Sequence, residues 1–270
     1  MPGPKPVERP ISFDRVAEVY DASRGLPEEL QREVLAHLVP HLAGGRTLDI
    51  GAGTGRFSVP LQQEAGLEIV AIDVASRMLA VGRGRGLANA VLGDARRLPF
   101  ADGSFDRAMS THLLHLIADW PAAVREIVRV TRVEYLSVLE RSRETPDLGV
   151  EYSAIARRHG VSTDSPGLSE RRLPDLCPPE RVEPVGGYRI ARPATEVIEQ
   201  LHRRLFRNQW DVPAALHRQI VRSLRREHAR DDVESTGTVE LAVWSVGRLG
   251  ALYGVDRARP EPLAGNRAVR

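Results

Sequence analysis

Thr47-Leu48-Asp49-Ile50-Gly51-Ala52-Gly53-Thr54-Gly55 is the stretch that decides the fold of this 270-residue chain. A short apolar run containing an acidic residue meets three glycines at every second position, which predicts a buried strand turning sharply into a helix. Glycine costs backbone entropy, so either the turn requires positive φ or a ligand lies against bare backbone. Both conditions occur in nucleotide-binding βαβ units, where ligands sit beyond the carboxyl ends of parallel strands.

The spacing of the glycines narrows the class of ligand. A hydride-transfer fingerprint would read G-x-G-x-x-G, but here Gly55 comes one residue early and Arg56 takes the last glycine position. The phosphate-binding pattern G-x-x-x-x-G-K-[ST] is absent, and Lys5 is the only lysine of the chain. The loop therefore fits a nucleotide-like ligand but marks no pyrophosphate or triphosphate. A tight turn without a ligand is the alternative.

An acidic residue followed by G-x-G-x-G resembles the first motif of class I S-adenosylmethionine (SAM)-dependent methyltransferases. Three further segments are similar to the small-molecule methyltransferases of the ubiquinone/menaquinone-biosynthesis type. They are the F-D-x-x-A-x-x-Y-D-x-x-R pattern of residues 13–24, the Leu-Pro-Phe and Ser-Phe-Asp segments within 98–106, and the helical pattern of 119–132. The Pro-Gly-Gly turn that usually precedes strand 5 of the family is missing after Arg132. Specific motifs cover residues 11–141, and the rest resembles the family by architecture.

The resemblance implies an α/β, Rossmann-like sheet of seven strands in the order 3-2-1-4-5-7-6. Strand 7 is expected to be antiparallel, with a helical insertion between the last two strands. Hydrophobic patterns predict strands at 46–50, 67–74, 90–95, 106–111, 133–140, 182–190 and 238–246. They predict helices at 27–42, 56–64, 148–159, 194–207 and 214–230.

We expect one methyltransferase domain over residues 11–257. Its cofactor-binding half is 11–141, its substrate-covering helices and strand 6 are 142–236, and its last strand is 237–257. Residues 1–10 are predicted to be disordered and 258–270 to form a flexible tail.

Several helix ends carry local signals. Pro27 suits a first helical position, and Ser76 is expected to cap a short helix. Asp119 is expected to cap a helix that has Pro121 in its first turn.

Asp73 is the first candidate for cofactor binding outside the glycine loop. It falls 22 positions after Gly51, about where dinucleotide folds place an acid that accepts from both ribose hydroxyls. An aspartate that merely caps the next helix is the alternative. Val74, its neighbour, is counted in the same site.

The resemblance implies the remaining cofactor contacts. Asp49, Gly51, Ala52 and Gly53 approach the methionine moiety, and Asp94, Ala95 and Met78 approach the adenine. Ser110 and Thr111 line the methyl end of the cofactor. Tyr20 and Arg24 belong to a lid that closes over it, although Tyr20 could equally pack on the core of a surface helix.

Methyl transfer from a sulfonium requires positioning more than covalent catalysis. If the acceptor is a hydroxyl or an amine, a general base can add roughly 10²–10⁴-fold. His112 and His115 are the candidates because they follow strand 4, where cofactor and acceptor meet in this fold. A structural role, as for the histidine of the family's L-H-H segment, is the alternative, and a carbon or sulfur acceptor would need no base.

Composition argues against several other classes of protein. The net charge is only +2, Cys177 is the single cysteine, and no apolar run reaches 18 residues, so we expect a soluble cytoplasmic protein without disulfides or a cysteine-rich metal site. His37 and His41 lie one helical turn apart, but no third ligand is evident, and no metal is predicted.

The sequence thus predicts an enzyme that transfers a methyl group from SAM to a small organic acceptor, leaving S-adenosyl-L-homocysteine (SAH). One alternative is a SAM-fold protein that binds SAM or SAH as a regulator or catalyses another reaction. A second is RNA methylation or nucleic-acid binding through the arginines of 218–230, although the acids beside them favour a solvated face. We expect a small-molecule acceptor, no nucleic-acid or membrane partner, and a monomer or homodimer.

Overall fold

A computed structural model describes residues 10–253 of the chain. These residues form one seven-stranded sheet of order β3-β2-β1-β4-β5-β7-β6, and β7 (Asp232–Ser245) runs antiparallel to both of its neighbours. Helices between β6 (Arg181–Pro193) and β7 form the expected insertion. The predicted fold class is therefore confirmed. Of residues 1–10, which are predicted to be disordered, 1–9 lie outside the described residues, as does the tail predicted at 258–270.

The first half of the described chain alternates strands with helices, and its strands pair in parallel. The strands are β1 (Thr47–Ile50), β2 (Ile69–Asp73), β3 (Ala90–Leu92), β4 (Phe105–Ser110) and β5 (Thr131–Thr145). The helices are α2 (Glu28–Leu42), α3 (Ser58–Gln63), α4 (Ser76–Gly84) and α5 (Trp120–Val130). Elsewhere in the chain, the short 3₁₀ helices are η2 (Leu114–Leu116), η3 (Glu170–Arg172) and η4 (Arg207–Gln209), and the short α-helices are α7 (Leu173–Leu176) and α10 (Val246–Ala251).

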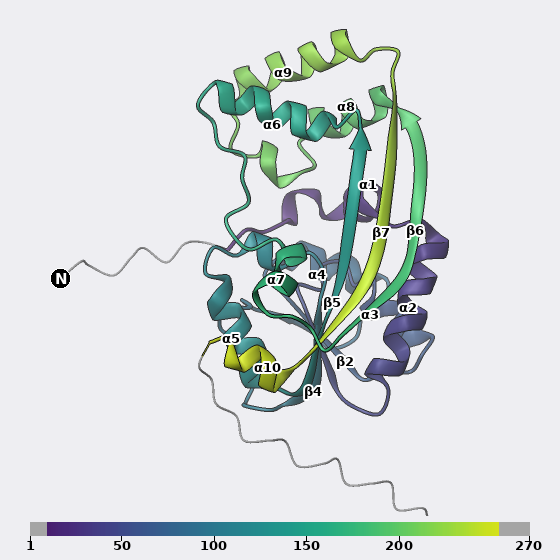
Figure 1. The fold of residues 1–270 in the computed structure, drawn as a ribbon, viewed down its shortest axis with the longest axis vertical. Helices are drawn as coiled ribbons and strands as arrows, with labels where there is room; N and C mark the ends of the chain where they lie inside the picture. The colour runs from purple at the N-terminus through teal and green to yellow at the C-terminus, as the bar shows by residue number, and fades with distance from the viewer. Residues whose placement is uncertain (1–9, 254–270) are drawn as a thin grey trace, which may run out of the picture.

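Both faces of the sheet are covered, because side chains alternate along each strand. Ile69 of β2 packs in a cluster with α2 and α3, whereas its neighbour Val70 packs in a cluster with α5 and α10. Figure 1 shows these helix pairs on opposite sides of the sheet. With helices on both faces of the sheet, the carboxyl ends of the parallel strands form the edge where a ligand site can lie.

Strands β5, β6 and β7 are longer than the sequence predicts. Helix α5 ends at Val130 and β5 begins at Thr131, so the missing Pro-Gly-Gly turn has no replacement loop. The extra strand length is polar, and the ion pair between Arg192 of β6 and Glu144 of β5 (2.8 Å) reaches across β7, which lies between these two strands. Polar cross-strand pairs stabilise a sheet without the apolar alternation that marks a strand in sequence.

The long strands carry a helical cap (Figure 1). The cap consists of α6 (Leu148–Arg158), α8 (Ala194–His202) and α9 (Ala214–Glu227), which share an apolar cluster with Val233 at the start of β7. Tyr152 of α6 and His217 of α9 are hydrogen-bonded inside it (2.7 Å). The insertion was predicted as two helices, and α6, from the segment before β6, completes it.

The N-terminal segment passes between the cap and the sheet (Figure 1). It contains η1 (Asp14–Val19) and α1 (Tyr20–Arg24). The Arg77 amide at the start of α4 donates to Asp14 Oδ1 (2.7 Å), and the Ala75 amide donates to Asp73. The cap predicted for Ser76 is therefore wrong, because two aspartates from outside the helix take these amides.

Two other helix starts were also predicted. Asp119 accepts from the Ala122 amide (3.2 Å) and caps α5 as expected. Pro27 stands one position before the first residue of α2, so its predicted place inside the helix is wrong. Over residues 10–253, we find no helix with the length and apolarity needed to cross a bilayer.

Candidate functional site

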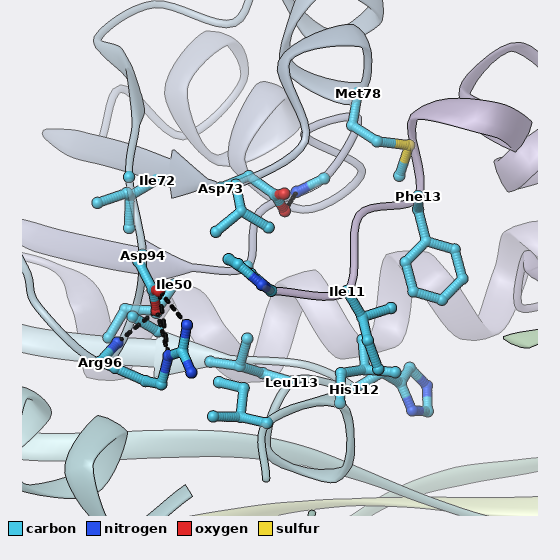
Figure 2. A pocket seen from close by; sticks show the side chains of 18 of the residues that line it. Ile11, Phe13, Ile50, Ile72, Asp73, Met78, Asp94, Arg96, His112 and Leu113 are labelled. Atoms are coloured by element: carbon cyan, nitrogen blue, oxygen red, sulfur yellow. Dashed lines mark hydrogen bonds and ion pairs between the residues drawn. The ribbon is translucent and has the colours of Figure 1, made fainter. Parts of the chain in front are cut away.

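A pocket opens at the carboxyl ends of β1, β2 and β4 (Figure 2). Ile11 and Phe13 of the N-terminal segment face it from the side opposite Ile72 and Asp94. The predicted cofactor residues that line it are Tyr20, Gly51, Gly53, Asp73, Val74, Met78, Asp94, Ala95 and Thr111. The fold thus brings residues from distant segments to one place.

The glycine loop meets both conditions inferred from its sequence. Gly51, Gly53 and Gly55 have φ of +74°, +58° and +72°, a region that side chains rarely adopt. A Cβ atom on Gly51 would lie 2.8 Å from Leu113 Cδ1. Gly51 and Gly53 line the pocket, so the loop also presents bare backbone there.

Asp73 holds this loop while keeping capacity for a ligand. Its Oδ2 accepts from the Gly53 amide (2.9 Å) and its Oδ1 from the Ala75 amide (2.7 Å). Burial raises the pKa of Asp73, against the effect of these amides. Each carboxylate oxygen accepts more than one hydrogen bond, so a lone pair on each remains for a pair of vicinal hydroxyls.

Asp94 marks the other side of the pocket. Arg96 holds its carboxylate through the backbone amide (2.9 Å) and through Nη2 (2.7 Å), as the dashed lines of Figure 2 show. Burial would raise the pKa of Asp94, but the hydrogen bonds from Arg96 bring it below its ordinary value. Apolar Ile50 and Ile72 line the same pocket, so it combines an apolar slot with two acids, which fits an adenosine group.

Two predicted residues lie beneath this pocket rather than on its wall. Asp49 is buried, accepts from Ser58 Oγ (2.5 Å), and borders a small adjoining hollow together with Ala52. Burial raises its pKa to about 7. Ser110 is fully buried, and its hydroxyl shares a hydrogen bond with that of Tyr135 (2.7 Å).

Arg24 connects residues 13–24 of the N-terminal segment, the predicted lid, to the segment that follows α8 of the cap. Its guanidinium carbon lies 4.8–5.0 Å from the ring centroids of Phe13, Tyr20 and Phe206. Its Nη2 donates to the Leu205 carbonyl (2.6 Å), which belongs to the segment after α8. Arg24 therefore lines the neighbouring cavity and holds Tyr20 in place, whereas Tyr20 itself lines the first pocket.

That neighbouring cavity, of about 440 Å³, lies between the lid, the long strands and the cap. It shares Phe13, Tyr20, His112 and Leu116 with the first pocket, so the two spaces adjoin. Its walls mix apolar and polar side chains. Two of the latter, Asn208 and Gln209, have a buried side-chain atom without a hydrogen-bond partner among the described residues.

The two predicted histidines occupy different positions. His112 follows β4 with φ of +56° and lines both spaces, and its Nε2 lies 3.4 Å from Glu140 Oε2. His115 lines the second cavity, and its Nδ1 lies 3.1 Å from Glu170 Oε2. Sequence reasoning missed both carboxylates, because β5 and η3 are distant in the chain and neither acid stands in a recognisable motif.

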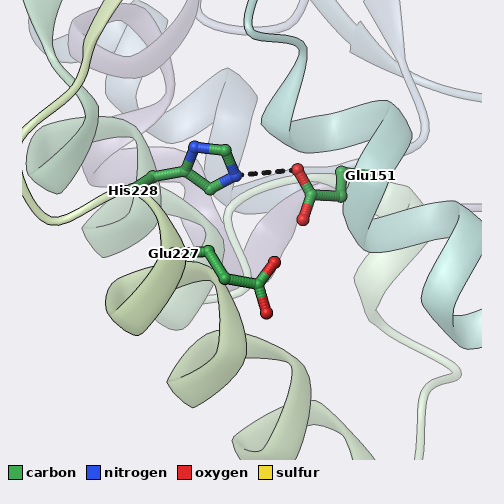
Figure 3. Close-up of side chains that lie close together, drawn as sticks. All are labelled: Glu151, Glu227 and His228. Atoms are coloured by element: carbon green, nitrogen blue, oxygen red, sulfur yellow. Dashed lines mark hydrogen bonds and ion pairs between the residues drawn. The ribbon is translucent and has the colours of Figure 1, made fainter.

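A second group of titratable side chains lies on the cap. Ligand-type atoms of Glu151, Glu227 and His228 lie within 4.8 Å of one another (Figure 3). His228 already contacts Glu151 through Nε2 (2.9 Å) and Asp231 through Nδ1 (2.7 Å). Glu227 accepts from Ser223 Oγ (2.7 Å). The group therefore acts as an ion-pair clasp that joins α6 to the end of α9.

Residues 48–134 match a family of methyltransferase domains (Methyltransf_11). A demethylmenaquinone methyltransferase of Renibacterium salmoninarum is 38% identical over 133 residues, which are 47% of this chain and 56% of that protein. A malonyl-[acyl-carrier protein] O-methyltransferase of Serratia marcescens is 37% identical over 122 residues, covering 45% and 47% of the two chains.

These matches confirm the resemblance to class I SAM-dependent methyltransferases in the half of the chain that carries the glycine loop. The matched stretch spans about half the length of each of these two relatives. The YcgJ protein of Bacillus subtilis is similar in structure, with a TM-score of 0.49 and 20% identity over 79% of this chain and 98% of that one.

We predict that Asp49→Asn stabilises the protein at high pH. Because the folded-state pKa of about 7 exceeds the ordinary 3.8, stability falls as the pH rises from about 4 through 7. The amide keeps the bond from Ser58 without a buried charge. Calorimetry at pH 8 should show a Tm increase of about 2–4 °C, the shift that 1 kcal/mol gives in a domain of this size. A gain at pH 4 as large as that at pH 8 would contradict the assignment.

We expect Arg24→Met to loosen the lid. The lost ring contacts and hydrogen bond are worth on the order of 1–2 kcal/mol. Amide hydrogen exchange of residues 13–24, followed by mass spectrometry, should become about tenfold faster. Arg225→Met, on α9 of the cap and outside both spaces, is the control and should leave this exchange unchanged. Equal rates in the wild type and Arg24→Met would show that Arg24 does not fasten the lid.

His228→Gln is expected to destabilise the cap in a pH-dependent manner. Burial lowers the pKa of His228, but hydrogen bonds to Asp231 and Glu151 raise it overall above 6.5. Its contribution to stability is therefore complete below pH 6.5 and is lost as the pH rises through the folded-state pKa. The Tm should fall by about 2–4 °C at pH 6 and by less at pH 9.

The control for this clasp is Arg225→Gln on α9, which removes an exposed ion pair to Glu199 of α8. Arginine does not titrate in this range, so its effect should be equal at both pH values. A larger loss for His228→Gln at pH 9 than at pH 6 would exclude a charged His228 in the clasp.

Proposed function

We propose that the chain transfers a methyl group from SAM to a small organic acceptor and releases SAH. The observation that carries this proposal is the convergence of the predicted cofactor residues on one pocket, which adjoins a second cavity under the cap. The class I methyltransferase fold and the family match over residues 48–134 support it.

The residues of the first pocket fit the parts of the cofactor. Asp73 would accept from the ribose hydroxyls, and Asp94 would face the adenine amino group. Burial beside the loop raises the pKa of Asp49, and the ammonium group of the methionine moiety would stabilise its charged carboxylate form. When bound, SAM supplies a methyl group already activated on a sulfonium, so the protein needs to orient the acceptor and exclude water.

The second cavity suits the acceptor. Its volume lies in the range of small-molecule pockets rather than that of a polymer groove. The lid and cap cover it, which would keep water from the reacting groups. The family match ends at residue 134, and much of the cavity wall comes from residues beyond it. The acceptors named for the relatives are therefore not transferred to this chain.

The first test is calorimetric titration of the full chain with SAH. We expect micromolar binding that Asp73→Asn weakens at least about tenfold, because one charge-assisted hydrogen bond contributes about 1.5–3 kcal/mol. The single oxygen of Asn can accept from only one of the Gly53 and Ala75 amides, so a thermal melt accompanies the titration to show that the variant is folded. Asp175→Asn, an exposed acid on α7, is the matched control and should bind SAH as the wild type does.

No binding of SAH to the wild type would refute the cofactor assignment. Binding without transfer to any acceptor would instead favour a regulator, or an enzyme that uses the fold for another reaction.

A further inference from the structure

His112 stands where the two spaces meet. The side chains that line both spaces are Phe13, Tyr20, His112 and Leu116, and of these four His112 carries the imidazole, the commonest general base of enzymes. Its backbone lies in the left-handed region of φ, which residues other than glycine rarely adopt. Such a conformation is characteristic of positions where function rather than local stability decides the geometry.

A carboxylate and a phenol lie behind this histidine. Glu140 Oε2 is 3.4 Å from His112 Nε2, and Tyr188 donates its hydroxyl proton to Glu140 Oε1 (2.7 Å). Burial would raise the pKa of Glu140, but the contacts with His112 and Tyr188 keep it below the ordinary value, so the group is a carboxylate. A carboxylate facing Nε2 favours the tautomer that carries its proton there, which leaves Nδ1 as the free base.

Resting on the proposed methyl transfer, we infer that His112 is the general base of the reaction and that the acceptor is a small molecule methylated on a hydroxyl oxygen. Glu140 is a positioning residue that fixes the tautomer of His112, and Tyr188 holds Glu140. A base between the cofactor pocket and the acceptor cavity serves a hydroxyl acceptor best, because the O–H proton must leave as the oxygen attacks. A neutral amine attacks through its lone pair and can lose its proton after the methyl group is transferred.

The step balances without a further reactant. The hydroxyl oxygen of the acceptor forms a bond to the methyl carbon, and the sulfur keeps the electron pair of the bond that breaks. The O–H proton passes to His112 Nδ1, and the imidazolium faces the Glu140 carboxylate. The products are a methyl ether, SAH and one proton, which His112 returns to solvent.

His115 is less suited to this role. It lines the acceptor cavity without reaching the cofactor pocket, and Glu170 engages its Nδ1 (3.1 Å). Its ring centroid is 6.3 Å from that of His112. The charged or titratable groups near His112 come from the lid, the glycine loop, η2, η3 and the long strands: Arg24, Arg56, His115, Glu170, Arg171, Glu140 and Tyr188.

The first arm of the test needs no acceptor. SAH titrations of the wild type, His112→Gln and Glu140→Gln give the Kd of each protein, so that the transfer rates of the second arm are compared with every variant saturated with cofactor. Nitrogen-15 NMR of the SAH complex should show His112 as the Nε2–H tautomer, and Glu140→Gln should lower the pH at which His112 titrates, because a neighbouring negative charge is lost. Glu134→Gln, an acid on the far part of β5 paired with Arg181, is the matched control.

The second arm uses SAM carrying a carbon-13 methyl group and the low-molecular-weight extract of the cells that natively make the protein. We expect the labelled product to show the carbon-13 shift of an O–CH₃ group. His112→Gln should reduce its formation by roughly 10²–10⁴-fold, the usual contribution of a general base. Glu140→Gln should move the acid limb of kcat/KM to lower pH, which a merely structural residue would not do.

The outcomes separate this inference from the proposed function. A label on nitrogen, carbon or sulfur, or a His112→Gln variant that retains full transfer, overturns the inference and leaves methyl transfer intact. An Nδ1–H tautomer of His112 overturns it as well. SAH binding by the wild type without any labelled product overturns both, and absence of SAH binding refutes the cofactor assignment itself.

Discussion

The hydrogen bond from the Gly53 amide to Asp73 Oδ2 is the contact on which the rest of the site depends. It joins the turn after β1 to the end of β2 and so fixes backbone that only glycine adopts without strain. The Gly51 and Ala52 amides reinforce it by donating to the Ile72 carbonyl (2.8 and 3.1 Å). A loop held in this way offers bare backbone on one side and an acid on the other, which is what an adenosine-containing ligand needs.

The lid and the cap are attached to this same turn. Thr54 Oγ1 donates to the Asp21 carboxylate (2.8 Å), and Arg24 three residues later reaches the Leu205 carbonyl of the cap segment. The cap in turn stands on β5, β6 and β7, whose polar ends extend beyond the body of the sheet. The first pocket and the second cavity, which we propose for the cofactor and the acceptor, are thus parts of one structural unit, and His112 lies at their junction.

The sequence predicts the parts of this construction that local physics dictates. The glycine loop demands a turn, Asp73 ends a buried strand, and Asp119 caps a helix, and each of these is visible within a few residues. The strand order, by contrast, came from resemblance to a family and not from the residues themselves. The lengths of β5, β6 and β7 were underestimated, because charged residues such as Arg192 and Glu144 hide strands that ion pairs support.

The candidate site shows the same division. Its loop, Asp73 and Asp94 could be named from the sequence, whereas Glu140, Glu170 and Arg96 could not. Their roles depend on which distant segments the fold brings beside His112, His115 and Asp94, and one sequence without relatives aligned to it carries no record of such pairings. Arg24 was expected over the cofactor, and its place against Leu205 depends on a cap that the sequence did not position.

The most direct measurement is a crystal structure of the chain with SAH. We expect the ribose to lie against Asp73 and the adenine beside Asp94 between apolar side chains. The sulfur should be directed past Tyr20 toward His112 and the second cavity. A ligand whose sulfur points away from that cavity, or one bound outside the glycine loop, would contradict the central claim that the two spaces form a single site for methyl transfer.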